Sequence, residues 1–72
     1  MIDYSPLWKT MKLRGETWYS MTKKHRIASS TMNRLKHNNP VSMRTINDLC
    51  QILSCTIPDI CQYIPCEDDQ LP

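Results

Sequence analysis

Signals that begin and end α-helices recur at short intervals along this chain and restrict it to a set of short helices. Ser5 followed by Pro6 is typical of an N-cap and a first helical residue, and Gly15, the only glycine, suits the left-handed position after a helix end. Thr17 can cap a second helix, and Pro65 blocks the last one. The signals predict five helices: about residues 6–14, 18–25 and 29–37, a fourth that begins after Ser42, and a fifth between Thr56 and Pro65.

Apolar residues repeat with helical spacing inside these segments. Ile46, Leu49 and Leu53 lie at positions i, i+3 and i+7 of one face of the fourth helix. Sheet signals are weak, because no segment alternates apolar and polar residues for long. We therefore expect a compact all-α fold of five helices, with one domain over residues 1–66 and an acidic tail over residues 67–72.

Charge is distributed unevenly along the chain. All nine lysines and arginines lie in residues 1–44 with two acids, a formal charge of +7, whereas residues 45–72 hold five acids and no base, a charge of −5. A positive field on one part of a small protein is typical of proteins whose partner is a polyanion. The sequence shows neither an apolar run that could span a bilayer nor a secretory leader, so we expect a cytoplasmic protein without a membrane partner.

The second and third predicted helices lie in the basic half and are separated by a short turn, which is the arrangement of a helix-turn-helix unit. The third helix would turn Met32 and Leu35 inward and a polar set outward: Ser29, Ser30, Asn33 and Arg34. Arginine can bond to guanine and asparagine to adenine, while serine adapts to either base. Three nearby lysines could neutralise phosphates: Lys23, Lys24 and Lys36. We therefore predict a protein that reads duplex DNA in the major groove with its third helix.

Four stretches follow one another in order: Leu7-Trp8-Lys9-x-Met11, the segment Ile-Ala-Ser-Ser-Thr-Met-Asn-Arg-Leu at 27–35, Pro40-Val41-Ser42, and the spaced apolar residues of 46–60. This series resembles the short, single-domain members of the Cro/CI-type (XRE-like) helix-turn-helix regulators of phages and bacteria, over about residues 4–64. The resemblance implies a lambda-repressor-like DNA-binding domain and a sequence-specific transcriptional regulator, with a repressor expected.

The resemblance also implies roles for single residues. Base contacts fall on the outer face of the third helix: Ser29, Ser30, Asn33 and Arg34. Phosphate contacts fall at the start of the second helix and in the loop after the third: Thr17, Trp18, His37, Asn38 and Asn39.

Three positions depart from the family pattern. Arg26 stands where the family usually has glycine, and Thr22 where it usually has a small residue. Because arginine is disfavoured at positive φ, these residues predict a remodelled turn or a second helix that runs differently. Ala28 replaces a capping serine or threonine, which is expected to lower the stability of the third helix by about 1 kcal/mol.

One copy of so small a domain buries too little DNA surface for high specificity, so we expect a homodimer. Its half-sites should lie about one DNA turn, ~34 Å, apart. The apolar and acidic C-terminal part is the predicted dimer interface, with Ile57 and Ile64, because its negative charge suits a position away from phosphate.

Residues for other chemistry are sparse. No arrangement of nucleophile, base and orienting group is evident, and His25 and His37 lack metal-ligand spacing, so we expect no enzyme, cofactor, metal or small-molecule substrate. Cys66 is the cysteine expected to be most exposed. Two alternatives remain open: a protein-interaction module that keeps the fold but has lost DNA binding, and a redox or metal sensor that uses the cysteines.

Overall fold

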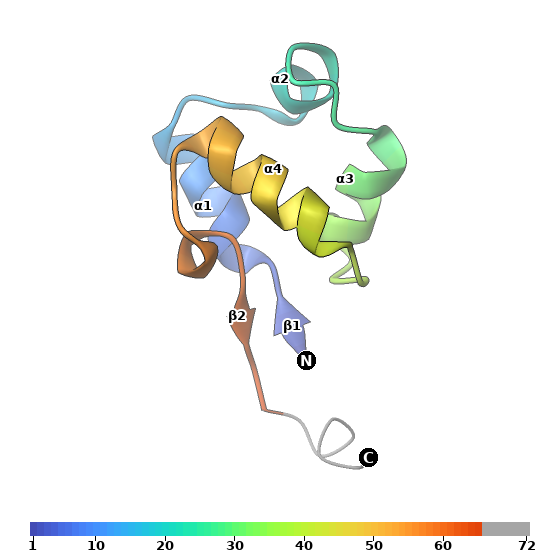
Figure 1. The fold of residues 1–72 in the computed structure, drawn as a ribbon, viewed down its shortest axis with the longest axis vertical. Coiled ribbons are helices and arrows are strands. Elements are labelled where there is room, and N and C mark those ends of the chain that lie inside the picture. Colours follow the sequence, from blue (N-terminus) through green and yellow to red (C-terminus); the bar gives the residue numbers. More distant parts are fainter. Residues whose placement is uncertain (66–72) are drawn as a thin grey trace.

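The computed structural model describes residues 1–65, so the predicted acidic tail and Cys66 lie outside the described part of the chain. In Figure 1, α4 crosses the centre of the molecule in front of α1, while α2 and α3 follow its upper and right-hand edges. The elements in chain order are β1 (Ile2–Asp3), α1 (Ser5–Leu13), α2 (Trp18–Lys23), α3 (Ser29–Lys36), α4 (Met43–Leu53), the 3₁₀ turn η1 (Ile57–Asp59) and β2 (Gln62–Tyr63).

The ends of the first four helices follow the signals in the sequence. The Thr17 hydroxyl accepts from the Ser20 amide at 3.1 Å, and the Ser20 hydroxyl accepts from the Thr17 amide at 2.8 Å, so α2 begins with a capping box. Ser42 caps α4 by accepting from the Thr45 amide at 3.2 Å. Gly15 has the expected positive φ, 72°. One detail differs: Tyr4 rather than Ser5 is the N-cap of α1.

The core forms where the apolar faces of the helices meet. The inward positions predicted for the third helix are confirmed, because Met32 and Leu35 have no exposed surface and fix α3 to the rest of the domain. Fully burying such a side chain contributes about 1.5–3 kcal/mol. The buried apolar residues are Tyr4, Leu7, Met11, Met21, Met32, Leu35, Ile46, Leu49, Leu53 and Ile60.

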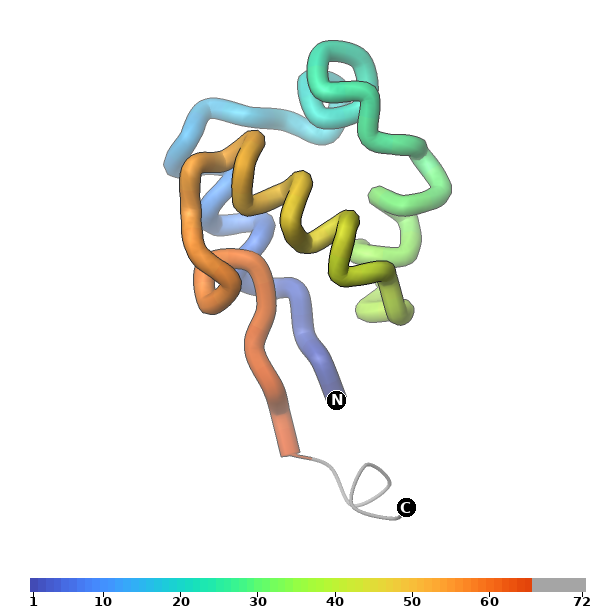
Figure 2. Tube along the Cα trace, in the orientation of Figure 1, coloured from blue at the N-terminus to red at the C-terminus, as the bar shows by residue number. Residues whose placement is uncertain are grey.

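The expected all-α fold is confirmed, but the predicted fifth α-helix is not, because residues 1–65 form four α-helices. Thr56 does begin a helical turn, with its amide donating to the Asp59 carboxylate at 3.1 Å, but η1 ends at Asp59. β2 then pairs antiparallel with β1, with Ile2 opposite Tyr63. Figure 2 shows the two ends of the described chain running side by side away from the helices. The backbone of Ile64 completes this pairing by bonding with Met1, and Pro65 opposes a helical conformation at Ile64.

One buried carboxylate joins three distant parts of the chain. Asp3 accepts from the Ser5 hydroxyl at 2.9 Å, from the Asn38 amide at 3.2 Å and from the Gln62 amide at 2.8 Å. Asn38 in turn accepts from the backbone amide of Tyr4 at 3.0 Å. The cluster thereby fastens both strands to the loop that follows α3.

Asp3 is expected to make the stability of the fold depend on acid. The hydrogen bond from Gln62 is the largest cause that lowers the pKa of Asp3 below its ordinary value of 3.8, although partial burial opposes it. Its contribution is therefore present above about pH 3.8 and is lost as the pH falls through the folded-state pKa. In urea unfolding across this range, Asp3→Asn should show a shallower pH dependence than the wild type. Equal slopes would contradict this account, and Asp48→Asn on α4 controls for the lost charge.

Candidate nucleic-acid interface

Helices α2 and α3 form a closely joined pair. The Ile27 amide donates to the carbonyl of Met21 at 3.0 Å, across the turn between the helices, and Met21 is fully buried against the core. Trp18 stacks on Trp8 of α1, with ring centroids 6.2 Å apart and planes 5° from parallel. Such pairing adds about 0.5–1.5 kcal/mol beyond area burial. The position of α2 is therefore set by its packing on the core and on α1, and the hydrogen bond across the turn joins the start of α3 to it.

The turn keeps the conformation that a glycine would favour, although arginine occupies it. Arg26 has φ 58°, in the left-handed region. The prediction of a remodelled turn is therefore wrong at this position. Thr22 fits because its hydroxyl donates to the carbonyls of Trp18 and Tyr19, each at 3.1 Å, within its own helix. Tertiary packing thus imposes a conformation that is locally unfavourable for Arg26.

Arg26→Gly is expected to stabilise the fold by about 1 kcal/mol. Relief of the left-handed conformation gains roughly 1–2 kcal/mol, and the added freedom of glycine in the unfolded chain removes roughly 0.4–1 kcal/mol. Lys24→Gly is the matched control, because Lys24 has φ −80° and its replacement should destabilise by about 0.5–1 kcal/mol. Chemical denaturation measures both, and stabilisation by Lys24→Gly as well would contradict the conformational explanation.

The outer face of α3 is polar and accessible. Its N-cap is Ala28, as predicted, with φ −61° and ψ 139° and no side-chain hydrogen bond to the first turn. At the other end the Asn39 amide donates to the Arg34 carbonyl at 2.8 Å, and Asn38 takes a left-handed φ of 56°. The four residues predicted to contact bases are all exposed and lie on this helix: Ser29, Ser30, Asn33 and Arg34.

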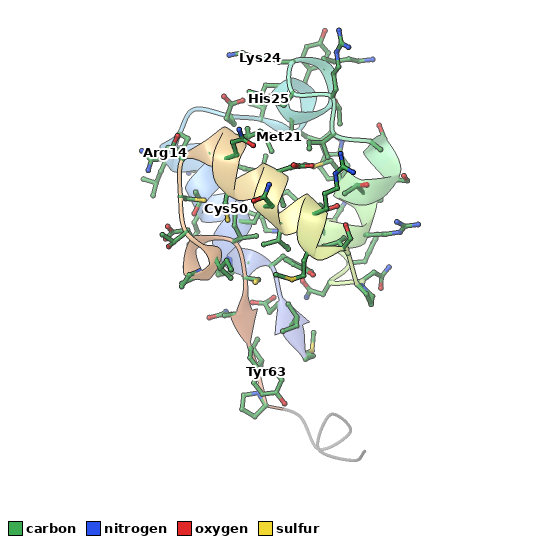
Figure 3. The ribbon with its side chains drawn as sticks, in the orientation of Figure 1. Arg14, Met21, Lys24, His25, Cys50 and Tyr63 are labelled. Atoms are coloured by element: carbon green, nitrogen blue, oxygen red, sulfur yellow. The ribbon has the colours of Figure 1, made fainter. Side chains whose placement is uncertain are left out.

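The residues predicted to contact phosphate lie at the start and end of α2, at the end of α3 and in the loop that follows α3, and one of them differs from the others. Asn38 directs its side chain into the Asp3 cluster described above, so its amide already has partners within the protein. Figure 3 shows Lys24 projecting from the end of the molecule opposite Tyr63. The other predicted phosphate contacts are exposed: Thr17, Trp18, Lys23, Lys24, Lys36, His37 and Asn39.

The sequence did not predict an interaction that joins the two ends of α2 through the Glu16 carboxylate. Glu16 accepts from the Ser20 hydroxyl at 2.5 Å, and its carboxylate lies 3.2 Å from Nε2 of His25. The hydrogen bond from Ser20 is the main cause that lowers the pKa of Glu16. Glu16 precedes α2 and His25 follows it, so this contact connects the segments at the two ends of α2. Tyr19, which the sequence analysis did not single out, is 71% exposed on α2.

Residues 1–65 contain neither a metal-binding cluster nor a membrane-spanning helix. No cluster of three or more histidine, cysteine, aspartate or glutamate side chains there is arranged to bind a metal ion. No helix in that range has the length and apolar character needed to cross a bilayer.

Comparison with known proteins identifies the arrangement of helices. The family model of the Cro/C1-type helix-turn-helix DNA-binding domain matches residues 6–66. The crystal structure of the transcriptional regulator VanUg, form II, superposes with a TM-score of 0.81 at 26% sequence identity, covering 89% of this chain and 85% of that one. No curated protein gives a significant match.

Proposed function

Since the chain belongs to the family of Cro/C1-type helix-turn-helix DNA-binding domains, we propose that it is a transcriptional regulator that binds duplex DNA through α2 and α3. The observation that carries this proposal is the two-sided character of α3. Its inner residues Met32 and Leu35 are fully buried, while four polar residues of its outer face are exposed. A helix fixed in this way can enter a groove without leaving the core.

In this proposal α3 lies in the major groove and each outer side chain has a distinct task. Arg34 forms two hydrogen bonds with a guanine, and Asn33 with an adenine, because their donor and acceptor patterns match those bases. Ser29 and Ser30 lie in the first turn of α3, where they accept or donate as the neighbouring bases require. Sequence specificity then depends on these side chains, whereas phosphate contacts set the orientation of the domain.

The phosphate contacts are assigned to the surroundings of α3. Lysine side chains carry most of the charge on this surface: Lys23, Lys24 and Lys36. Polar contributions come from both flanks: Thr17, Trp18, His37, Asn38 and Asn39. For Asn38 the contact falls to the second hydrogen of its side-chain amide, because the first donates to Asp3 and the backbone amide donates to the Leu35 carbonyl at 3.2 Å.

Lys23→Ala is expected to weaken binding to all duplexes alike and to flatten its salt dependence. Each phosphate contact that is lost should reduce the slope of log K against log salt by about 1. Lys12→Ala, an exposed lysine on α1, is the matched control and should leave the slope unchanged. Fluorescence anisotropy over a salt series gives both slopes. Equal slopes for Lys23→Ala and the wild type would contradict the phosphate role, and absence of binding in low salt would favour a protein-interaction module.

The same proposal includes a homodimer that represses by occupying its operator. Ile57 and Ile64 are 50% and 41% exposed, so both side chains are accessible to a second subunit. Tyr63, next to Ile64, lies at the end of the molecule opposite Lys24 (Figure 3), so a partner there would leave the basic end free for DNA. Two domains would together bury the area that specific binding needs.

A further inference from the structure

The C-terminal end of α4 brings two cysteines together. The Cys55 amide donates to the Cys50 carbonyl at 3.0 Å, and the Ser54 amide donates to the Gln51 carbonyl at 3.4 Å. Ser54 has a left-handed φ of 50°. This is a Schellman motif, in which Cys50 and Cys55 occupy the two positions whose side chains pack against each other across the helix end.

The backbone bond limits the separation of the two residues. Standard bond lengths added to that bond place their Cα atoms less than about 7 Å apart, near the range in which disulfides form. Both side chains line one apolar groove of about 570 Å³, which Met43, Ile46 and Ile57 also border. Both cysteines are partly exposed, so a small reagent can reach them.

Cys50 also influences the pKa of the Cys55 thiol. Burial is the main cause that raises the pKa of Cys55, and the negative charge that a Cys50 thiolate would carry raises it further. Burial likewise raises the pKa of Cys61, whose sulfur lies 4.0 Å from the carbonyl oxygen of Ile57. Cys55 therefore meets Cys50 as a protonated thiol at neutral pH, which suits it to the second step of an exchange rather than the first.

We propose that Cys50 and Cys55 form a reversible dithiol–disulfide pair that reacts with low-molecular-weight disulfides such as glutathione disulfide. The Cys50 thiolate attacks one sulfur of the reagent, which forms a mixed disulfide and releases one thiolate of the reagent. Cys55 then loses its proton and attacks the Cys50 sulfur, which releases the second thiolate. Two protein thiols are oxidised and one disulfide is reduced to two thiols, and an excess of the reduced reagent reverses both steps.

Formation of the disulfide would change the groove beside Ile57, which both cysteines line, and would leave the surface of α3 unchanged. Cys55 begins the segment that leads to η1, so the bond would tie that segment to α4. Because the chemistry belongs to the thiols alone, the proposal stands or falls separately from the assignment of DNA binding.

Peptide mapping tests the pair directly, because cleavage before Asp48 and Asp59 places Cys50 and Cys55 in one peptide and the other two cysteines in another. A protease that cleaves before aspartate should release residues 48–58, with Cys50 and Cys55, and a peptide from Asp59 onward, with Cys61 and Cys66. The folded chain is equilibrated with glutathione and glutathione disulfide, alkylated and digested, and the peptide masses are measured by mass spectrometry. We expect the 48–58 peptide to lack two hydrogens and to escape alkylation, and to become alkylated when reduced glutathione is in excess.

Two variants separate this pair from general thiol oxidation. Cys61→Ser should leave the internal disulfide intact, whereas Cys55→Ser should stop at a mixed disulfide with glutathione on Cys50. Circular dichroism verifies that both variants are folded. A disulfide that links the two peptides, or a 48–58 peptide alkylated at both cysteines while the others are oxidised, would overturn the proposal.

Discussion

Arg34→Ala is expected to relax base preference at one position of the operator by about 1–3 kcal/mol, which corresponds to roughly 5- to 150-fold in relative affinity. Arg34 is exposed on α3, and the same helix is fixed by the buried Leu35 next to it, so the substitution removes a contact without moving the helix. Competition between the operator and single-base variants measures the loss, position by position.

Lys36→Ala supplies the control on the same helix. Lys36 is exposed and is assigned to phosphate, so its loss should weaken all competing duplexes to a similar degree and preserve their ranking. If Arg34→Ala preserves the ranking as well, the position of α3 in the groove is wrong. If Lys36→Ala alters the ranking at one base, the division between base and phosphate contacts is wrong.

Leu35→Ala is expected to cost about 2–5 kcal/mol in the free energy of unfolding. Leu35 is fully buried and, with Met32, holds α3 on the core, so its truncation leaves a cavity beneath the proposed reading helix. Domains of this size are marginally stable, with totals at the low end of roughly 5–15 kcal/mol. The variant should therefore be largely or wholly unfolded near 37 °C and should lose DNA binding through unfolding.

Leu13→Ala is the matched control, because it removes the same atoms from a leucine that is 84% exposed at the end of α1. Its effect should remain within about 0.5 kcal/mol. Urea denaturation followed by circular dichroism compares the two. A Leu35→Ala variant as stable as Leu13→Ala would contradict the packing of α3 on the core.

The sequence predicted those parts of the fold that depend on local chemistry. Thr17 and Ser42 cap their helices, and Gly15 takes positive φ, because each of these preferences acts within a few residues. The fifth helix failed for a non-local reason. The spacing of Ile57, Ile60 and the residues after them fits a helix, but pairing with the distant N-terminal strand is an interaction that the periodicity of one segment does not contain.

The same difference between local preferences and distant interactions applies to the candidate nucleic-acid interface. Exposure of the polar residues on α3 follows from the amphipathic pattern, which fixes which face is buried once Met32 and Leu35 are inside. The left-handed conformation of Arg26 was not predictable, because packing around the turn overrides its local preference. Asn38 was assigned to phosphate, yet its partner within the protein is Asp3, 35 residues away in sequence.

Selection of bound sequences from a pool of random duplex DNA tests the reading role of α3 most directly. The wild type should enrich a palindromic site whose half-sites lie about one turn, ~34 Å, apart. Arg34→Ala, selected in parallel, should lose preference at one guanine in each half-site and keep the rest. Failure of the wild type to enrich any sequence in low salt, or an unchanged motif with Arg34→Ala, would contradict the claim that this helix reads base pairs.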